Sequence, residues 1–219
     1  MGILSAFLDI LFPPRCVFCR SFLRGGEKLI CDKCADALPY TGAGDGKTGD
    51  FFTVCEAPLF YEGTVRDSLL RFKFKGATTY SKAYGVLLAA CIRERLSGKY
   101  DLISWVPLSS KRLKERGYDQ SMLLAMAAAL ELDDVAVCTL DKVKDVEKQS
   151  TVGSAEKRRA NISGAYRAAD PELVNGRRIL LIDDIVTTGS TLSECARTLL
   201  EAGAAEVVCA AVARVREDG

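Results

Sequence analysis

The feature that most constrains the fold is a short apolar run that ends in two acids. The run is Ile179–Ile182, and Asp183 and Asp184 follow it directly. It is too short for a helix and is bounded by charges, as is typical of a central strand in a parallel sheet. Because ligands of open α/β sheets bind beyond the carboxyl ends of the strands, the acid pair is predicted to face a ligand.

A loop rich in hydroxyl groups is predicted to separate this strand from the next helix. Its residues are Thr187, Thr188, Gly189, Ser190 and Thr191. Gly189 permits a tight turn and a close approach to an anion, and free N–H groups at the helix start complete a phosphate cradle. The alternative is a simple capping box made by Thr191 and Glu194, which leaves the two preceding carboxylates unexplained.

The rest of the chain after residue 50 alternates strand-like and helix-like stretches. Strands are predicted at two places within 52–61 and at 101–106, 135–140, 179–182 and 206–213. Helices are predicted at 64–73, 80–96, 120–130 and from 192 to a stop at Gly203. Residues 141–165 are charged, lack periodicity and are predicted to form a long loop. This order predicts an α/β fold with a mostly parallel sheet and helices on both faces.

Four of the nine cysteines form two pairs near the N-terminus. They are Cys16, Cys19, Cys31 and Cys34, in the spacing C-x2-C-x11-C-x2-C. Four thiolates close a tetrahedral site, so this pattern predicts structural zinc, and the repeated spacing disfavours four ordinary cysteines. The other five lie in apolar stretches and are predicted to be small buried hydrophobes. This usage indicates a reducing, cytoplasmic location and not a disulfide framework.

Composition removes several functional classes. The chain has no histidine, which excludes Ser-His-Asp and Cys-His catalysis and any imidazole-bound metal. Its formal net charge is +1, so a globally basic nucleic-acid binder is not indicated.

The N-terminal stretch is apolar, with hydrophobic residues at helical spacing before Pro13 and Pro14. It is too short to span a membrane and is predicted to be an amphipathic helix that packs on its own protein, so no integral membrane segment is expected. Residues 41–50 read as a linker. The predicted division is therefore 1–50, a helix and four-Cys module with linker, and 51–219, an α/β domain.

A basic segment follows the predicted strand that ends at Pro107. Hydroxyl groups and cations at the carboxyl end of a parallel strand suit a diphosphate, and Arg116, next to Gly117 and Gln120, is the favoured cation. The alternative is a solvated basic turn, which stays open for Lys111 and Lys114.

Several motifs together resemble one family. Leu180–Leu192 is similar to the phosphoribosyl-pyrophosphate (PRPP) signature of type I phosphoribosyltransferases. CVFC, CDKC, WVPLSSKRLKERGYDQS at 105–121 and KQS with RRANISGAY at 148–166 resemble the ComF competence-protein family over nearly the whole chain. The resemblance implies a type I phosphoribosyltransferase fold with a small N-terminal zinc-ribbon-like module, and a link to uptake of transforming DNA.

The resemblance also implies roles for individual residues. Asp183 and Asp184 would bind the ribose hydroxyls, and residues 187–191 the 5-phosphate. Arg116 and Arg158 would hold the pyrophosphate that leaves with Mg2+. The remaining candidates for pyrophosphate binding or for a cover over the site are Pro107, Lys73, Gln120, Gln149 and Asn161.

The chain departs from the family pattern in three places. Asp119 replaces the usual Asn, Ser150 replaces the common Thr, and 41–55 lacks a further cysteine pair, which leaves Cys55 alone. The first two changes keep the polarity of the site, whereas the third makes the zinc module smaller.

Three functions are compatible with these residues. The first is a Mg2+-dependent phosphoribosyltransferase that positions the sugar and neutralises pyrophosphate without histidine. The second is a non-catalytic PRPP- or nucleotide-binding protein whose zinc module docks single-stranded DNA or a helicase partner. The third is a zinc-dependent adaptor with a vestigial pocket. The residues specify neither the acceptor nor the oligomeric state.

Overall fold

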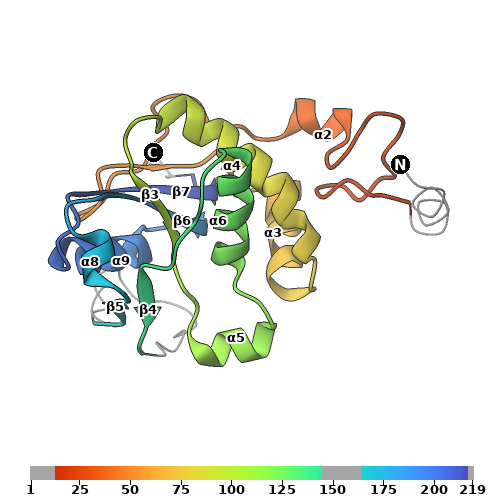
Figure 1. Cartoon of the computed structure of the whole chain (residues 1–219). Helices are drawn as coiled ribbons and strands as arrows, with labels where there is room; N and C mark the ends of the chain where they lie inside the picture. Colours follow the sequence, from red (N-terminus) through yellow and green to blue (C-terminus); the bar gives the residue numbers. More distant parts are fainter. Residues whose placement is uncertain (1–12, 145–163, 217–219) are drawn as a thin grey trace.

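The centre of the protein is a five-stranded parallel sheet (Figure 1). The computed structural model describes residues 13–144 and 164–216. The strands of this sheet are β1 (Cys55–Glu56), β2 (Leu59–Phe60), β3 (Leu102–Trp105), β6 (Arg178–Val186) and β7 (Glu206–Arg214). β6 lies between β3 and β7, and both β1 and β2 pair with the outer side of β7. The predicted parallel sheet is confirmed.

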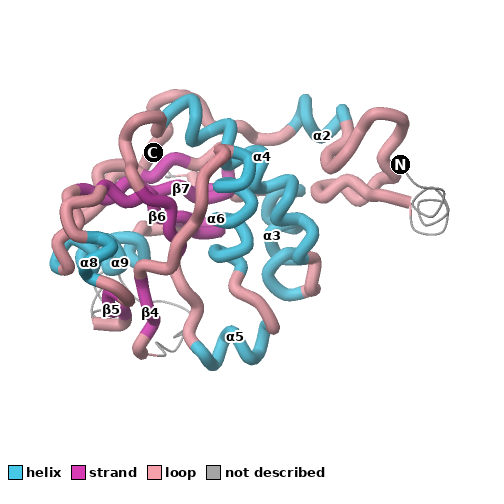
Figure 2. The backbone as a smooth tube through the Cα atoms, viewed as in Figure 1, coloured by secondary structure: helices cyan, strands magenta, loops and turns pink. Residues whose placement is uncertain are grey.

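Helices cover both faces of this sheet, as predicted (Figure 2). They are α2 (Asp32–Ala37), α3 (Gly63–Phe74), α4 (Ser81–Arg95), α5 (Ser110–Arg116), α6 (Gln120–Glu131), α8 (Pro171–Val174) and α9 (Ser190–Glu201), with the 3-10 turn η1 (Thr78–Tyr80) before α4. A small antiparallel pair, β4 (Leu140–Lys142) and β5 (Tyr166–Ala168), lies apart from the main sheet. Within the described residues, no helix has the length and apolar character needed to cross a membrane.

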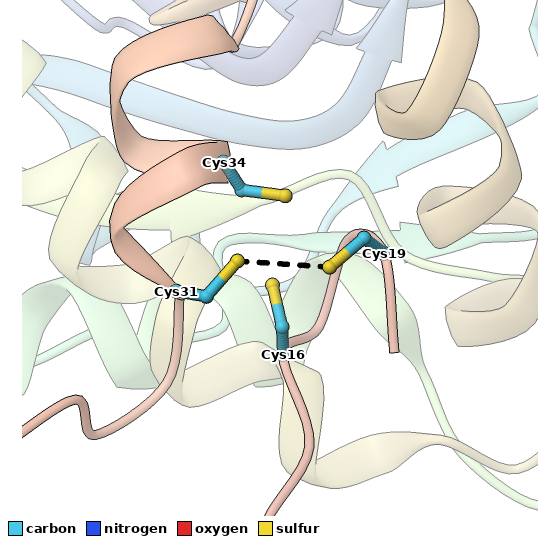
Figure 3. Close-up of side chains that lie close together, drawn as sticks. All are labelled: Cys16, Cys19, Cys31 and Cys34. Atoms are coloured by element: carbon cyan, nitrogen blue, oxygen red, sulfur yellow. Dashed lines mark hydrogen bonds between the residues drawn. The ribbon is translucent and has the colours of Figure 1, made fainter. Parts of the chain in front are cut away.

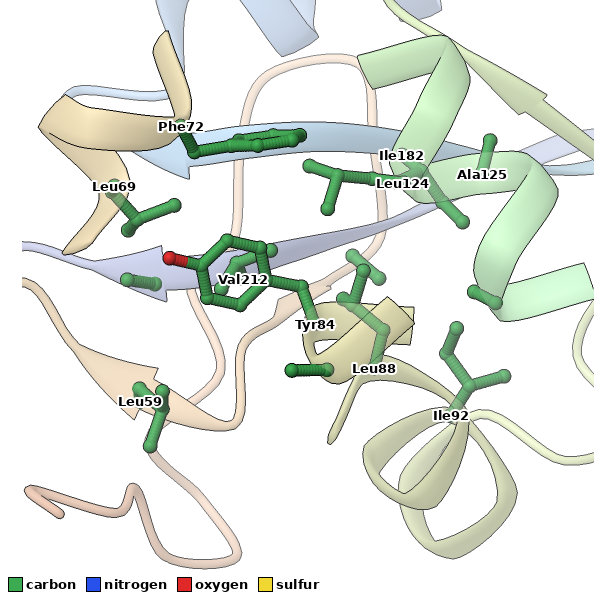
Figure 4. Packing of buried hydrophobic residues seen from close by; sticks show 14 of the residues in the cluster. Leu59, Leu69, Phe72, Tyr84, Leu88, Ile92, Leu124, Ala125, Ile182 and Val212 are labelled. Carbon is green, nitrogen blue, oxygen red and sulfur yellow. The ribbon is translucent and has the colours of Figure 1, made fainter. Parts of the chain in front are cut away.

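The alternation of side chains along β6 divides the hydrophobic core into two. Leu180 and Ile182 pack into the cluster formed by α3, α4 and α6, which Figure 4 shows around Tyr84 and Leu124. Ile179 and Leu181 point to the opposite face, into the cluster with α9. Because every residue of this strand segment is buried on one face or the other, the run is continuously apolar.

The four-Cys module packs on the first of these cores. Its residues Val17 and Phe18 are buried, and the Phe18 ring meets Tyr84 edge-on at 6.1 Å between centroids. Ser68 Oγ of α3 donates to the Val17 carbonyl at 2.6 Å. Arg71 donates to the same carbonyl at 3.0 Å and to that of Phe18 at 2.7 Å. The module is therefore held by both apolar and polar contacts, while the predicted division between 50 and 51 stays a prediction.

The structure corrects three predictions about strands and loops. The strand predicted at 179–182 continues to Val186, so both acids lie inside it. The strand predicted at 135–140 does not form: Ala136 makes one isolated bridge to Ile103, and pairing resumes only at β4. β4 begins at Leu140 and extends to Lys142, inside the predicted loop 141–165, because its partner β5 supplies the hydrogen bonds.

Two further corrections concern the basic segment and the cysteines. The segment after Pro107 forms helix α5, capped at its start by the side chain of Ser109, where a turn was an open alternative. Cys138 is exposed, whereas Cys55, Cys91, Cys195 and Cys209 are buried as predicted. The predicted N-terminal helix lies outside the described residues.

Candidate functional site

The two acids of β6 are each held by a side chain from another helix. Ser121 Oγ, at the start of α6, donates to Asp183 Oδ1 at 2.9 Å, and the Asp184 backbone N–H donates to the same oxygen at 2.8 Å. Lys73 Nζ, near the end of α3, lies 2.8 Å from Asp184 Oδ2. Both partners come from α3 and α6, two helices that cover the same face of the sheet. The structure brings Lys73, a predicted pyrophosphate residue, directly to the acid pair.

Among the residues that the structure describes, the negative charge of the acid pair is only partly balanced. Burial, followed by the neighbouring charge of Asp184, raises the pKa of Asp183 to about 7, although Lys73 and two hydrogen bonds act in the opposite direction. A carboxyl group that is half ionised near neutral pH gains from a cation or from hydroxyl groups that donate to it. Two adjacent carboxylates also offer the oxygen ligands that Mg2+ prefers.

The predicted phosphate loop is shorter than the sequence suggested. Helix α9 begins at Ser190, so Ser190 and Thr191 belong to its first turn. Gly189 is the N-cap residue, with a φ of 79° that favours glycine, and no side chain caps the helix. The capping box of Thr191 and Glu194 is therefore wrong, because Glu194 instead pairs with Arg197. The first N–H groups of α9 keep their capacity to bind an anion.

The hydroxyl groups of the loop are partly organised. Thr188 Oγ1 and Ser190 Oγ are 2.9 Å apart, and the Ser190 N–H donates to Thr188 Oγ1 at 3.4 Å. Thr187 and Thr188 are exposed, which leaves them accessible to a ligand.

The segment after β3 is tied to α6 by Asp119, the residue that departs from the family pattern. Asp119 Oδ2 accepts the Leu108 N–H at 2.8 Å, and Oδ1 accepts the Met122 N–H at 3.1 Å as the N-cap of α6. These two donors reach different oxygens, so an asparagine in the same orientation would place its NH2 group, which cannot accept, opposite one of them. Burial raises the pKa of Asp119. Asp119 therefore fits the two backbone N–H groups that it meets, and it fixes the turn that contains Pro107.

Arg116 and Gln120, predicted as a pyrophosphate grip, contact each other. Arg116 Nη1 donates to Gln120 Oε1 at 2.6 Å, and its guanidinium lies 5.1 Å from the centroid of the exposed Phe74 ring. Arg116, the last residue of α5, thus places its guanidinium beside Phe74, which follows Lys73 at the end of α3. Three further predicted residues, Gln149, Arg158 and Asn161, lie outside the described residues.

The N-terminal cysteines form the predicted cluster. The ligand atoms of Cys16, Cys19, Cys31 and Cys34 all lie within 4.8 Å of one another (Figure 3). The Sγ atoms of Cys19 and Cys31 are 3.6 Å apart. Thiolates bound to tetrahedral zinc at about 2.3 Å lie about 3.8 Å from one another, so the cluster fits the ion. A hydrogen bond with Ser21 lowers the pKa of Cys19 to about 6, which favours the thiolate that zinc requires.

Two protein families match this chain, each over a different segment. Residues 119–219 match the phosphoribosyl transferase domain family, and residues 7–44 match the double zinc ribbon domain family. Competence protein ComFC of Bacillus subtilis is 29% identical over 212 residues, which are 88% of this chain and 80% of that protein. The chain is a homologue of the ComF competence proteins. Competence protein F of Haemophilus influenzae is 28% identical to this ComF homologue, and the alignment covers 91% of this chain and 96% of protein F.

Shorter similarities extend to other proteins. DNA utilization protein YhgH of Escherichia coli (strain K12) is 38% identical over 49% of this chain and 46% of its own length. Among solved structures, glutamine PRPP amidotransferase from B. subtilis is 25% identical over 61% of this chain, with a TM-score of 0.42. That similarity spans 26% of the amidotransferase chain.

Sequence reasoning missed two groups of residues at the site of this ComF homologue. Ser121 was noted only as part of a motif, although it holds Asp183. Lys142 and Tyr166, on β4 and β5, contact each other at 3.0 Å between Nζ and the phenol oxygen. Burial raises the pKa of Tyr166, and smaller contributions to the rise come from Cys195 and Asp183. No sequence pattern predicted that β4 and β5 pair.

Proposed function

We propose that this ComF homologue binds PRPP together with Mg2+ at the carboxyl edge of its sheet, and that it transfers or senses the phosphoribosyl group. One observation carries the proposal. Asp183 and Asp184, held by Ser121 and Lys73, lie near the carboxyl end of the strand that leads into the loop before α9. The phosphoribosyl transferase domain match over 119–219 includes this strand, loop and helix.

The described residues supply binding and orientation. Asp183 and Asp184 accept hydrogen bonds from the ribose hydroxyl groups, and the Ser121 hydroxyl fixes the first carboxylate. The N–H groups at the start of α9 bind the 5-phosphate. Mg2+, when bound with PRPP, neutralises charge that develops on the leaving pyrophosphate. We further propose that Arg116 and Arg158 hold that pyrophosphate, so that catalysis depends on position and charge without histidine.

The cellular role that we propose is an association with DNA uptake in the cytoplasm. Its support is that two relatives aligned over most of the chain are named competence proteins, and that a third is named a DNA utilization protein.

The direct test is titration of PRPP, with Mg2+, into the wild type and into the double variant Asp183→Asn, Asp184→Asn. Each lost charge–hydrogen-bond contact costs about 1.5–3 kcal/mol, so the double variant is expected to bind at least a hundredfold more weakly. Calorimetry measures the affinities. The matched control is Asp133→Asn, Asp134→Asn, two adjacent acids on the surface after α6, which should bind as the wild type does. Equal affinity in all three proteins would remove the site assignment.

A second candidate function is a non-catalytic accessory protein whose zinc module docks single-stranded DNA or a helicase partner. The observation that favours it is Phe22, which is 52% exposed and carries the Arg15 guanidinium 4.1 Å from its ring centroid. Exposed aromatic rings beside cations stack with single-stranded bases. Release of pyrophosphate from PRPP with a panel of bases and amines would favour the enzyme, and PRPP binding without turnover would favour the accessory protein. No rise in Tm with PRPP and Mg2+ would indicate the adaptor with a vestigial pocket.

A further inference from the structure

The segment that the sequence presents as a linker forms a hairpin on the main sheet. The Lys47 N–H donates to the Cys55 carbonyl at 3.0 Å, and the Cys55 N–H donates to the Lys47 carbonyl at 2.7 Å. Cys55 belongs to β1, which pairs with β7 in the central sheet. The backbone of Lys47 is therefore fixed to the same sheet that presents the acid pair.

The turn of this hairpin packs against the phosphate loop. Phe52 is buried, and a Cβ atom on Gly189 would lie 3.3 Å from its ring. A Cβ atom on Gly49 would lie 2.3 Å from the same ring, so the turn closes over Phe52 only because Gly49 has no side chain. The ring thus fills the space between the two glycines and holds the hairpin against the loop.

The side chain of Lys47 reaches the same place. Its Cε atom lies 3.7 Å from the Cβ position of Gly189, which is the N-cap residue of α9. The lysine is half-buried, and it already has an interaction in the free protein. The ammonium nitrogen is one bond further along the side chain, so a cation from outside the loop is within reach of the N-cap residue of α9.

We propose that Lys47 binds the 5-phosphate of PRPP. This inference rests on the proposed function, and it adds a residue to the same site. The loop from Thr187 to Thr191 contains no cation, and backbone N–H groups alone leave the charge of a phosphate dianion only partly balanced. A lysine acts as a point charge toward phosphate and does not require the planar geometry of an arginine. The ligand class that depends on Lys47 is therefore a sugar 5-phosphate.

The test separates the 5-phosphate from the pyrophosphate of PRPP. Calorimetry measures the binding of PRPP, ribose 5-phosphate and inorganic pyrophosphate, each with Mg2+, to the wild type and to Lys47→Gln. A charge-assisted hydrogen bond to phosphate is worth about a tenfold change in affinity. Lys47→Gln is expected to bind PRPP and ribose 5-phosphate about tenfold more weakly and to bind pyrophosphate as the wild type does. Lys47→Arg keeps the charge and should recover most of the affinity.

The control variant is Lys99→Gln. Lys99 is exposed and precedes β3, so it lies at the opposite edge of the sheet, and its loss should change none of the three affinities. Unchanged ribose 5-phosphate and PRPP affinities in a folded Lys47→Gln would overturn the role of Lys47 while the proposed function stands. Equal weakening of all three ligands would also overturn it, because the effect would then not belong to the 5-phosphate. Absence of PRPP binding in the wild type would overturn the proposed function itself.

Discussion

The acidic side chains that lie at the two ends of β6 have opposite electrostatic surroundings. At the amino end, Arg178 meets Asp101 with 2.6 Å between Nη2 and Oδ1 and 3.1 Å between Nε and Oδ2. Hydrogen bonds from this arginine hold the pKa of Asp101 at about 2. At the carboxyl end, burial and the charge of Asp184 raise the pKa of Asp183 to about 7.

The difference shows which end of the strand is complete without a ligand. The amino-end carboxylate has its full charge balanced by one guanidinium of the same chain, in contact with solvent. The carboxyl end places two acids side by side, and the ion pair that the described residues form there is with the ammonium of Lys73. A ligand that brings cations or hydroxyl groups therefore gains more at the carboxyl end than at the amino end.

Among substitutions at the two ends of β6, removal of Lys73 should produce the largest change in the free energy of unfolding. Lys73→Met leaves Asp184 largely buried beside a second acid with no ammonium, and we expect the free energy of unfolding to fall by about 2–3 kcal/mol at pH 8. Lys73 lowers the pKa of Asp183, so without this cation the pKa of Asp183 rises further and this acid takes up a proton as the pH falls. The loss should therefore shrink at pH 5. Urea unfolding at the two pH values measures it.

Lys75→Met is the matched control for this prediction. Lys75 is two residues further along, exposed, at the C-cap of α3, and its loss should cost a few tenths of a kcal/mol. Similar losses in the two variants would mean that the Lys73–Asp184 contact contributes nothing beyond surface charge.

The second effect has the opposite sign. Asn at position 183 keeps an oxygen that can accept from Ser121 and from the Asp184 N–H, and it removes one of two like charges. A carboxyl whose pKa is raised in the folded state costs stability above its unfolded pKa of about 4, and the full cost applies above pH 7. Asp183→Asn is therefore expected to raise the free energy of unfolding at pH 8 by about 1 kcal/mol, which corresponds to a rise in Tm of roughly 2–4 °C. The gain should fade toward pH 4 in thermal unfolding. A lower Tm at pH 8 would show that the charge of Asp183 beside Asp184 does not destabilise the folded state.

The parts of the site that the sequence could predict are those built from neighbouring residues. The strand, the acid pair and the loop before α9 follow one another, and each cysteine pair lies within four residues. Local spacing is then enough to identify the chemistry. The errors within this segment are errors of length, because pairing with β7 extends β6 through the acids to Val186, whereas pairing with β3 ends at Ile182.

The parts that could not be predicted come from distant segments. Ser121 and Asp183 are 62 residues apart, and Lys47 approaches Gly189 only because its hairpin pairs with β1 at the sheet edge. The segment 41–50 is rich in glycine and polar residues, which predicts a loop and says nothing of what the loop packs against. β4 and β5 escaped prediction for the same reason, since each is too short to show periodicity.

The smallest effect is expected at the amino end of the strand. Asp101→Asn can still accept from the Arg178 backbone N–H but loses the charge that pairs with the guanidinium. Because the pKa of Asp101 is lowered in the folded state, its contribution is present above pH 4 and disappears as the pH falls toward 2. The Tm of this variant should therefore lie slightly below that of the wild type at pH 7 and converge with it near pH 2. The pair is exposed, so 0.5 M salt should reduce the difference at pH 7. A loss of stability as large as that of Lys73→Met would contradict the contrast between the two ends, because the exposed ion pair would then contribute as much as the buried one.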